Sequence, residues 1–169
     1  VMSNYSKRKA FTIHKKIYFP KNQAGSGIQF VLAPNKHRNT IFIVDEASMI
    51  PDRPTDSKMF ANGSLLDDLM MYVYSGYNCK LVLIGDTAQL PPVHLDLSPA
   101  LDEDKLSLNY NKEVVCLELD EVMRQAEGSG ILMNATNLRE QLQGHFFDGF
   151  KFDVNPFKDI VRLIDGHDI

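Results

Sequence analysis

Cysteine is scarce in this sequence, and long runs of apolar residues are absent. The 169 residues include two cysteines, Cys79 and Cys116, which are too few for a disulfide scaffold or a four-thiolate zinc site. Both lie in apolar stretches, a setting typical of reduced core cysteine, and this predicts a cytoplasmic location. No segment approaches the roughly 18 apolar residues of a membrane-spanning helix, so we expect no membrane partner.

Signs of disorder and of secretion are also missing. Hydrophobic residues make up 44% of the chain and charged residues 24%, which is typical of globular proteins and excludes a disordered or low-complexity chain. The chain begins with Val1 rather than Met, and no charged-then-apolar signal segment follows. We therefore expect a piece of a longer protein, of a length that suits one domain or a large part of one.

Carboxylates are absent from the first 40 residues. Eight basic side chains lie there: Lys7, Arg8, Lys9, Lys15, Lys16, Lys21, Lys36 and Arg38. The rest of the chain is acidic, since the whole has 18 basic and 22 acidic side chains. This asymmetry predicts a contact with a polyanion at the N-terminal end, with a lysine-rich solvated surface as the alternative.

Apolar patterning predicts alternating strands and helices. The runs rich in β-branched residues are 28–32, 40–45, 80–85 and 113–119. The second and third are almost continuously apolar, which is typical of strands buried on both faces of a parallel sheet. Capping signals at Ser64 and Gly76 bound a helix between them, and a second helix is expected over 129–143. Residues 51–62 and 95–111 are predicted loops, and 160–164 could form a further strand.

Two acidic residues follow the first apolar strand, in the sequence IFIVDEASMI of residues 41–50. Nucleotide-hydrolysing α/β proteins bind their ligands at this edge of the sheet. There Asp45 can hold Mg²⁺, and Glu46 can orient and deprotonate a water molecule. Solvated acids with no such role are also common at strand ends, so the pair alone is weak evidence for a nucleotide site. Polar residues at the end of the neighbouring strand would strengthen it.

The neighbouring strand has a polar end of its own, in KLVLIGDTAQLPPV of residues 80–93. We expect Gln89 near the same edge, where its carboxamide can accept from water and donate to a γ-phosphate oxygen. Arg124 follows in LDEVMRQ, residues 119–125. Its guanidinium can offset charge on a transferring phosphoryl group, although a surface salt bridge is the alternative.

These segments resemble motifs of the superfamily 1 DNA helicases. DEAS at 45–48, GDTAQLPPV at 85–93 and VMRQ at 122–125 resemble motifs II, III and IV. The QLPPV ending and the RQ pair are similar to the RecD-like branch, that of the exodeoxyribonuclease V alpha subunit. AFTIHKKIY at 10–18 resembles that branch's motif Ia, which touches single-stranded DNA. After Val93 the chain departs from the family, which usually continues with glycines.

The resemblance implies an α/β fold of the P-loop-NTPase-like (RecA-like) kind, a mostly parallel sheet flanked by helices, here incomplete. Residues 1–145 would be the centre of the first motor domain, and 146–169 its end or the connection to the next. The implied activity is an ATP-dependent DNA helicase, with single-stranded DNA and other helicase–nuclease subunits as partners.

The resemblance also implies site residues and cofactors. Asp45 would hold Mg²⁺, and Glu46 would activate the water that attacks ATP. Gln89 and Arg124 would contact the γ-phosphate of ATP. The residues on the path of single-stranded DNA would be Thr12, His14, Lys15 and Lys16.

A phosphate-binding loop, G-x-x-x-x-G-K-[ST], is missing, because none of the ten glycines precedes a lysine. We therefore expect this chain alone to bind MgATP weakly and to hydrolyse it negligibly, with the activity in the parent protein. Two alternatives stay open: a PhoH-type ATPase, and a degenerate, non-catalytic nucleic-acid-binding module. A purely structural domain is a third class, but in that case the polar residues at the strand ends would occur together by chance.

Overall fold

The computed structural model describes residues 7–23, 27–52, 64–119, 128–144 and 149–161. The chain divides into two compact units, Val1–Cys116 and Leu117–Ile169, and each is described by itself. Among the described residues, no helix combines the length and the apolar character that a membrane span requires.

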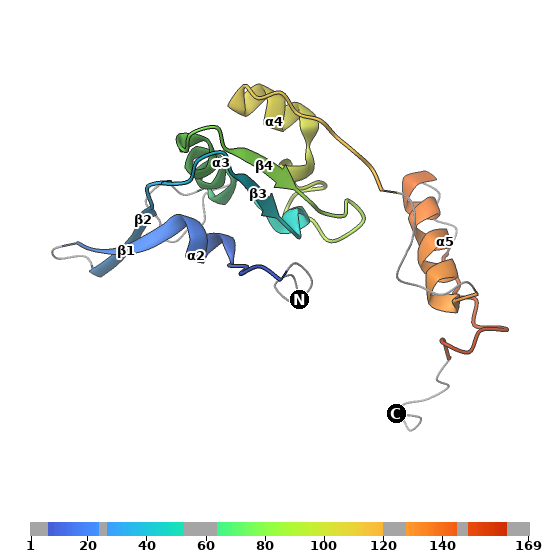
Figure 1. Ribbon diagram of the computed structural model, residues 1–169. Coiled ribbons are helices and arrows are strands. Elements are labelled where there is room, and N and C mark those ends of the chain that lie inside the picture. The colour runs from blue at the N-terminus through green and yellow to red at the C-terminus, as the bar shows by residue number, and fades with distance from the viewer. Residues whose placement is uncertain (1–6, 24–26, 53–63, 120–127, 145–148, 162–169) are drawn as a thin grey trace. The chain divides into compact units, whose positions relative to one another are not determined.

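The first unit contains two small sheets and several short helices (Figure 1). Its elements, in chain order, are α2 Ile13–Ile17, β1 Tyr18–Gln23, β2 Gly27–Leu32, β3 Ile41–Val44, the 3₁₀ helix η1 Ala47–Met49, α3 Leu65–Ser75, β4 Lys80–Leu83, the 3₁₀ helix η2 Pro99–Leu101 and α4 Glu103–Tyr110. β1 and β2 form an antiparallel hairpin, and β3 and β4 form a parallel pair.

The parallel pair is the strand–helix–strand unit that the sequence predicts. β3 and β4 pair in the register Ile41 with Lys80 through Val44 with Leu83, and α3 connects them along the chain. The predicted strands at 40–45 and 80–85 and the predicted helix between them are therefore confirmed. One face of the pair is apolar and packs against the core with Phe42, Val44, Leu81 and Leu83.

Helix α3 begins and ends where its capping residues predict. The side chain of Ser64 accepts a hydrogen bond from the backbone N–H of Asp67 (3.2 Å), and this satisfies a free donor of the first turn. At the other end, Asn35 Nδ2 donates to the backbone oxygens of Tyr72 (2.9 Å) and Val73 (3.2 Å). A Cβ on Gly76 would lie 2.5 Å from that nitrogen, so glycine permits the approach.

Two tyrosines attach neighbouring elements to the first turn of α3. Tyr18 donates its hydroxyl to Asp68, whose side chain is fully buried, and Tyr110 donates to Asp67 (2.7 Å). Burial, then the hydrogen bond and the charge of the neighbouring aspartate, raise the pKa of each phenol, so both remain donors. Acidic residues in a first helical turn also suit the helix dipole.

The expectation that the central strands are buried on both faces is wrong for the described residues. Ile41 and Ile43 of β3 and Val82 of β4 are exposed, because the side chains alternate and the described elements pack on one face of the two-stranded sheet. The predicted strand at 113–119 is also wrong. That segment has no ladder partner, although Val114 packs against the core.

Two other predictions need correction. The strand expected at 28–32 is confirmed as β2, but it pairs antiparallel with β1, which the sequence analysis missed. Pro20 and Lys21 interrupt the apolar pattern of β1, and a hairpin edge tolerates them. Residues 95–111 are not a loop throughout, since they contain η2 and α4. Asp102 caps α4 by accepting from the backbone N–H of Lys105 (3.0 Å), and Leu106 is buried.

The second unit contains α5, Gly130–Gly144, which confirms the helix predicted over 129–143. Asp159 accepts hydrogen bonds at its N-terminus from Ser129 Oγ (2.6 Å) and from the backbone N–H groups of Gly130 (2.9 Å) and Ile131 (3.3 Å). Asn134 also exchanges hydrogen bonds with the backbone of Asp153. Residues 160 and 161 are not in a strand, and 162–164 lie outside the described residues.

Replacing Tyr18 with phenylalanine should lower the free energy of unfolding by about 1–3 kcal/mol, because it removes the donor to a buried carboxyl group. Urea denaturation followed by circular dichroism measures this change. Tyr77→Phe is the matched control, since the Tyr77 hydroxyl is exposed and has no partner among the described residues. Equal losses in the two variants would contradict the anchoring role of Tyr18.

Replacing Asp159 with alanine should weaken the N-terminal turn of α5 at neutral pH. Hydrogen bonds, first from Ser129, lower the pKa of Asp159 from its ordinary value of 3.8. Because the folded pKa is lowered, the stabilisation is present above 3.8 and is lost as the pH falls through the folded value. At neutral pH, the amide hydrogens of Gly130 and Ile131 should be better protected from exchange in the wild type than in the variant. In acid, the protection of these amides should become equal in the two proteins. The exposed Lys158→Ala change is the control.

Candidate functional site

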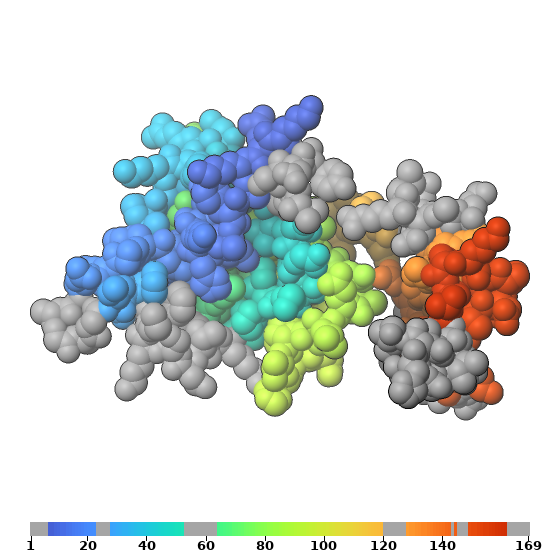
Figure 2. Space-filling model, turned by 90° about the horizontal axis from the view of Figure 1, so that it is seen from below, coloured from blue at the N-terminus to red at the C-terminus, as the bar shows by residue number. Residues whose placement is uncertain are grey.

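Backbone hydrogen bonds bring the carboxyl ends of β3 and β4 together. Ile84 N donates to Val44 O and Ala47 N donates to Ile84 O, both at 2.8 Å, so the parallel pairing continues past the strands. Residues 45–50 and the segment after β4 therefore lie next to each other, as the turquoise and yellow-green surfaces in Figure 2 show. This is the edge at which the sequence analysis expects a nucleotide.

Gly85 lets the two strand ends approach closely. A Cβ at this position would lie 2.9 Å from the backbone nitrogen of Ser48 and 2.8 Å from Leu101 Cδ1. The backbone of Ser48 cannot give way as a flexible side chain could, because η1 is hydrogen-bonded on both sides. Glycine at 85 is thus a packing requirement of this edge.

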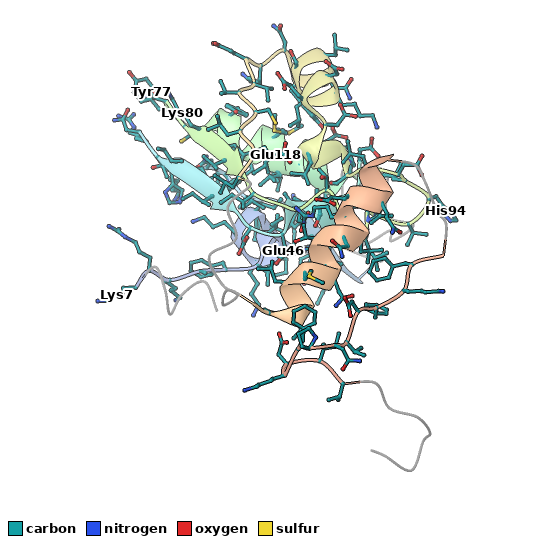
Figure 3. All side chains as sticks on the ribbon, turned by 90° about the vertical axis from the view of Figure 1, so that its right-hand side faces the viewer. Lys7, Glu46, Tyr77, Lys80, His94 and Glu118 are labelled. Atoms are coloured by element: carbon teal, nitrogen blue, oxygen red, sulfur yellow. The ribbon has the colours of Figure 1, made fainter. Side chains whose placement is uncertain are left out.

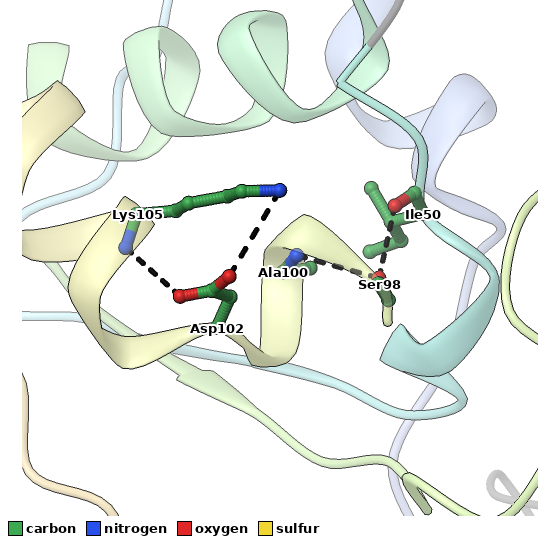
Figure 4. Close-up of polar contacts among 5 residues, drawn as sticks. All are labelled: Ile50, Ser98, Ala100, Asp102 and Lys105. Atoms are coloured by element: carbon green, nitrogen blue, oxygen red, sulfur yellow. Dashed lines mark hydrogen bonds and ion pairs between the residues drawn. The ribbon is translucent and has the colours of Figure 1, made fainter. Parts of the chain in front are cut away.

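Ser98 fixes the segment that follows the two acids (Figure 4). Its hydroxyl oxygen lies 2.9 Å from Ala47 O and 3.0 Å from Ile50 O, and it accepts from the backbone N–H of Ala100 (3.3 Å). Ser98 is 1% exposed, so these contacts are shielded from water. Its chain segment comes from beyond β4, and sequence reasoning did not single it out.

Asp45 and Glu46 lie at the tip of this edge and are both exposed. Asp45 Oδ1 accepts from the backbone N–H of Glu46 at 3.2 Å. Glu46 has φ 58° and ψ 41°, in the left-handed region that non-glycine residues rarely adopt. The backbone therefore turns sharply at Glu46, directly after Asp45.

The carboxylates at this edge could hold Mg²⁺ only together with the phosphate oxygens of a bound nucleotide. Within the described residues, no group of three His, Cys, Asp or Glu side chains is arranged to hold a metal ion. Mg²⁺ in triphosphate sites is held through one or two carboxylates together with phosphate oxygens and waters. Asp45 offers one exposed carboxylate at this edge.

Gln89 ends a turn at the same edge. Gln89 N donates to Asp86 O (3.1 Å), and Ala88 N donates to Asp86 Oδ1 (3.0 Å). The Gln89 side chain is exposed and forms no hydrogen bond with Glu46 in this structure. Arg124 lies outside the described residues.

The predicted DNA-contacting residues lie on and beside α2. Thr12 is the N-cap, with its Oγ1 3.4 Å from Lys15 N, and the His14 ring lies 5.8 Å from that of Tyr18. Lys16 Nζ lies 2.9 Å from His37 Nε2. Thr12, His14 and Lys16 thus also have structural contacts, whereas Lys15 is exposed and its side chain forms no hydrogen bond or ion pair with the described residues.

Phe11 is a candidate that the sequence analysis missed. It is 51% exposed, and the ammonium groups of Lys9 and Lys16 lie 5.0 Å and 5.7 Å from its ring centroid. An exposed ring between two cations suits stacking with a nucleobase whose phosphates meet the lysines. The signal was present in the sequence, as an aromatic residue flanked by basic ones in RKAFTIHKK.

A surface cavity of about 390 Å³ lies in the second unit, and its lining includes none of the predicted site residues. It is lined by Asn137, Glu140, Gln141, Gly144, Phe150 and Lys151. Comparison of the chain with protein-family models, with curated proteins and with solved structures found no match.

Replacing Ser98 with alanine should lower the free energy of unfolding by about 1–3 kcal/mol, because it removes the one shielded hydroxyl donor shared by two carbonyl oxygens and the acceptor of the Ala100 N–H. It should also speed amide exchange at Ile50, whose N–H closes η1. Urea denaturation and hydrogen exchange measure the two effects. Ser107→Ala, at an exposed position of α4, is the control and should change neither; an unaltered Ile50 exchange rate in Ser98→Ala would contradict the role of Ser98.

Proposed function

We propose that this chain is the central part of the first motor domain of an ATP-dependent DNA helicase or translocase, with a RecA-like fold. The parent protein would couple ATP hydrolysis to movement on single-stranded DNA. The chain's own contribution would be the acids of the hydrolytic site, the γ-phosphate sensor and one contact with DNA.

One observation supports this proposal most directly. The segments DEAS and GDTAQ follow two adjacent parallel strands, and backbone hydrogen bonds from Ile84 to Val44 and from Ala47 to Ile84 hold their starts at one edge of the sheet. Ligands of open α/β sheets bind outside the carboxyl ends of the strands, so this is where a nucleotide would be expected. A chance pairing of exposed acids would not need Gly85 and Ser98 to hold the edge together.

The chemistry assigns each polar residue a separate task. Asp45 would hold Mg²⁺, which in such a site neutralises charge on the β- and γ-phosphate oxygens. Glu46, turned away by its left-handed backbone, would orient the attacking water and accept its proton. Gln89 would donate to the γ-phosphate, and Arg124 would offset the charge that develops on it.

The proposal requires a phosphate-binding loop that these 169 residues do not contain. Backbone N–H groups and a lysine normally surround the phosphates, and without them most contacts with the triphosphate are missing. The solvent-exposed position of Asp45 and Glu46 is consistent with a site that a further segment of protein, carrying the phosphate-binding loop, would cover. The chain alone is therefore expected to bind MgATP weakly.

A non-catalytic nucleic-acid-binding module is the second candidate. The arrangement of Lys9, Phe11 and Lys16 favours it, since two cations around an exposed ring need no ATP chemistry. Retention of Asp45, Glu46 and the glutamine turn favours the motor instead, because a binding module does not need them. A PhoH-type ATPase would share the two acids and the glutamine, but the Ala–Ser pair after the acids and the PPV ending of residues 91–93 argue against it.

Replacing Glu46 with glutamine in the full-length parent protein should reduce DNA-stimulated ATP hydrolysis by about 10²–10⁴-fold, because the water loses its proton acceptor. Phosphate release, with and without single-stranded DNA, measures this. ATP affinity should change little, since the amide keeps the size of the acid. The 169-residue chain assayed in parallel should show negligible turnover.

The exposed Glu103→Gln change on α4 is the matched control and should leave hydrolysis unchanged. Turnover by the short chain that is lost in Glu46→Gln would contradict the need for an external phosphate loop. A parent protein with no ATP hydrolysis would overturn the motor proposal and favour the binding module.

A further inference from the structure

A second group of basic and aromatic residues lies at the opposite end of the β3–β4 sheet. We call it the amino-edge surface, and its residues are Lys36, Arg38, Tyr74, Tyr77, Lys80 and Lys112. In Figure 3, Tyr77 and Lys80 lie at one end of the parallel strands and Glu46 lies at the other. Lys36 and Arg38 belong to the basic segment noted in the sequence, whereas Tyr74, Tyr77 and Lys112 belong to none of its motifs.

The backbone at this edge is firmly fixed. Arg38 and Tyr77 form a parallel bridge, and Asn39 N donates to Tyr77 O at 2.9 Å. Asn39 and Asn78 both have left-handed backbone angles, φ 48° and 50°, and Asn78 Nδ2 donates to Asn39 Oδ1 (2.8 Å). The two side chains at 38 and 77 are therefore presented side by side before any ligand arrives.

Each aromatic ring of this surface has a cation against it. Tyr77 is 67% exposed, and the Arg38 guanidinium carbon lies 5.6 Å from its ring centroid. Lys112 Nζ lies 4.4 Å from the ring centroid of Tyr74, which is partly exposed at the end of α3. Lys80, exposed at the start of β4, adds a further charge three residues beyond Tyr77.

The charge of this edge is strongly positive. The segments that form it are 34–41, 74–82 and 109–113, and among their residues Glu113 is the single carboxylate against four lysines and arginines. In the described residues, none of those four cations forms an ion pair with a carboxylate. They are consequently free to meet the phosphates of a ligand.

The amino-edge surface is connected to the basic N-terminal segment. His37 stands between Lys36 and Arg38 in the chain, and its Nε2 lies 2.9 Å from Lys16 Nζ on α2. This contact places one residue of the amino-edge segment beside the α2 segment that carries Lys16. Two separated stacking rings joined by cations suit successive unpaired bases and their phosphates.

We propose that the amino-edge surface is a second contact site for single-stranded nucleic acid, with Tyr77 as its stacking residue. Tyrosine and arginine also anchor protein interfaces, so the competition test described below includes an acidic polypeptide. The site involves no step of ATP hydrolysis, so it goes beyond the proposed motor function. With this second site, the chain would contact more nucleotides of a single-stranded nucleic acid than the α2 segment could contact alone.

Fluorescence anisotropy of a labelled oligothymidylate of about 20 nucleotides would test the site on the 169-residue chain. Tyr77→Ala combined with Arg38→Gln should weaken binding about tenfold or more, the effect of losing one stacked base and one phosphate contact. Tyr77→Phe, which keeps the ring, should bind like wild type. Phe152→Ala and Lys158→Gln, an exposed ring and an exposed cation in the second unit, are matched controls.

Photo-cross-linking to an oligonucleotide that contains bromouracil locates the contact independently of affinity. Adducts on Tyr77 or Tyr74 would support the site. Adducts confined to residues 7–18, with normal binding by the Tyr77→Ala, Arg38→Gln variant and loss in Lys15→Gln, Lys16→Gln, would overturn it and leave the motor proposal intact. Displacement of the oligonucleotide by poly-glutamate as readily as by unlabelled DNA would also overturn it, in favour of an acidic protein partner.

Discussion

The parallel pairing of β3 with β4, extended by one residue at its carboxyl end, is the constraint on which the candidate site depends. Ile84 donates to Val44 and accepts from Ala47, so the two polar loops leave the sheet at the same place. A slip of the register by one residue would turn the alternating side chains to the other face and separate the loops. Ser98 and Gly85 depend on this pairing, and they hold the two loops against each other once the strands are in register.

Helix α3 connects this edge to the rest of the first unit. Its first turn holds α4 through Tyr110 and the α2–β1 segment through Tyr18, while Asn35 closes its last turn. The segment proposed to contact DNA is therefore attached, through one buried carboxyl group, to the helix that links the two central strands. A change in the position of α2 would disturb the hydrogen bond from Tyr18 to Asp68. Water could not replace that bond, because the Asp68 side chain is buried.

The two ends of the parallel pair differ in charge. Exposed acids lie at the carboxyl end, and exposed cations with tyrosine rings lie at the amino end. Separation of this kind keeps negatively charged phosphates of a nucleic acid away from carboxylates that would repel them. In the proposed functions, a nucleotide and a single strand would use different ends of this sheet and different residues.

The sequence alone determined the local elements whose signals are local. Ser64 and Gly76 bounded α3, and the apolar runs gave β3 and β4, because capping and alternation act over a few residues. Tertiary structure decided the rest. Val115 lies in a segment that has the pattern of a strand but pairs with no other strand among the described residues. β1 forms despite Pro20 because β2 supplies the ladder. α4 forms because Leu106 packs into the core and Tyr110 binds α3. Asp45 and Glu46 could be chosen from sequence, since they follow a readable strand. Phe11 could also have been chosen, from the basic residues that flank it. Ser98 and the contact of Arg38 with Tyr77 could not, because each depends on a residue that only folding brings close to it.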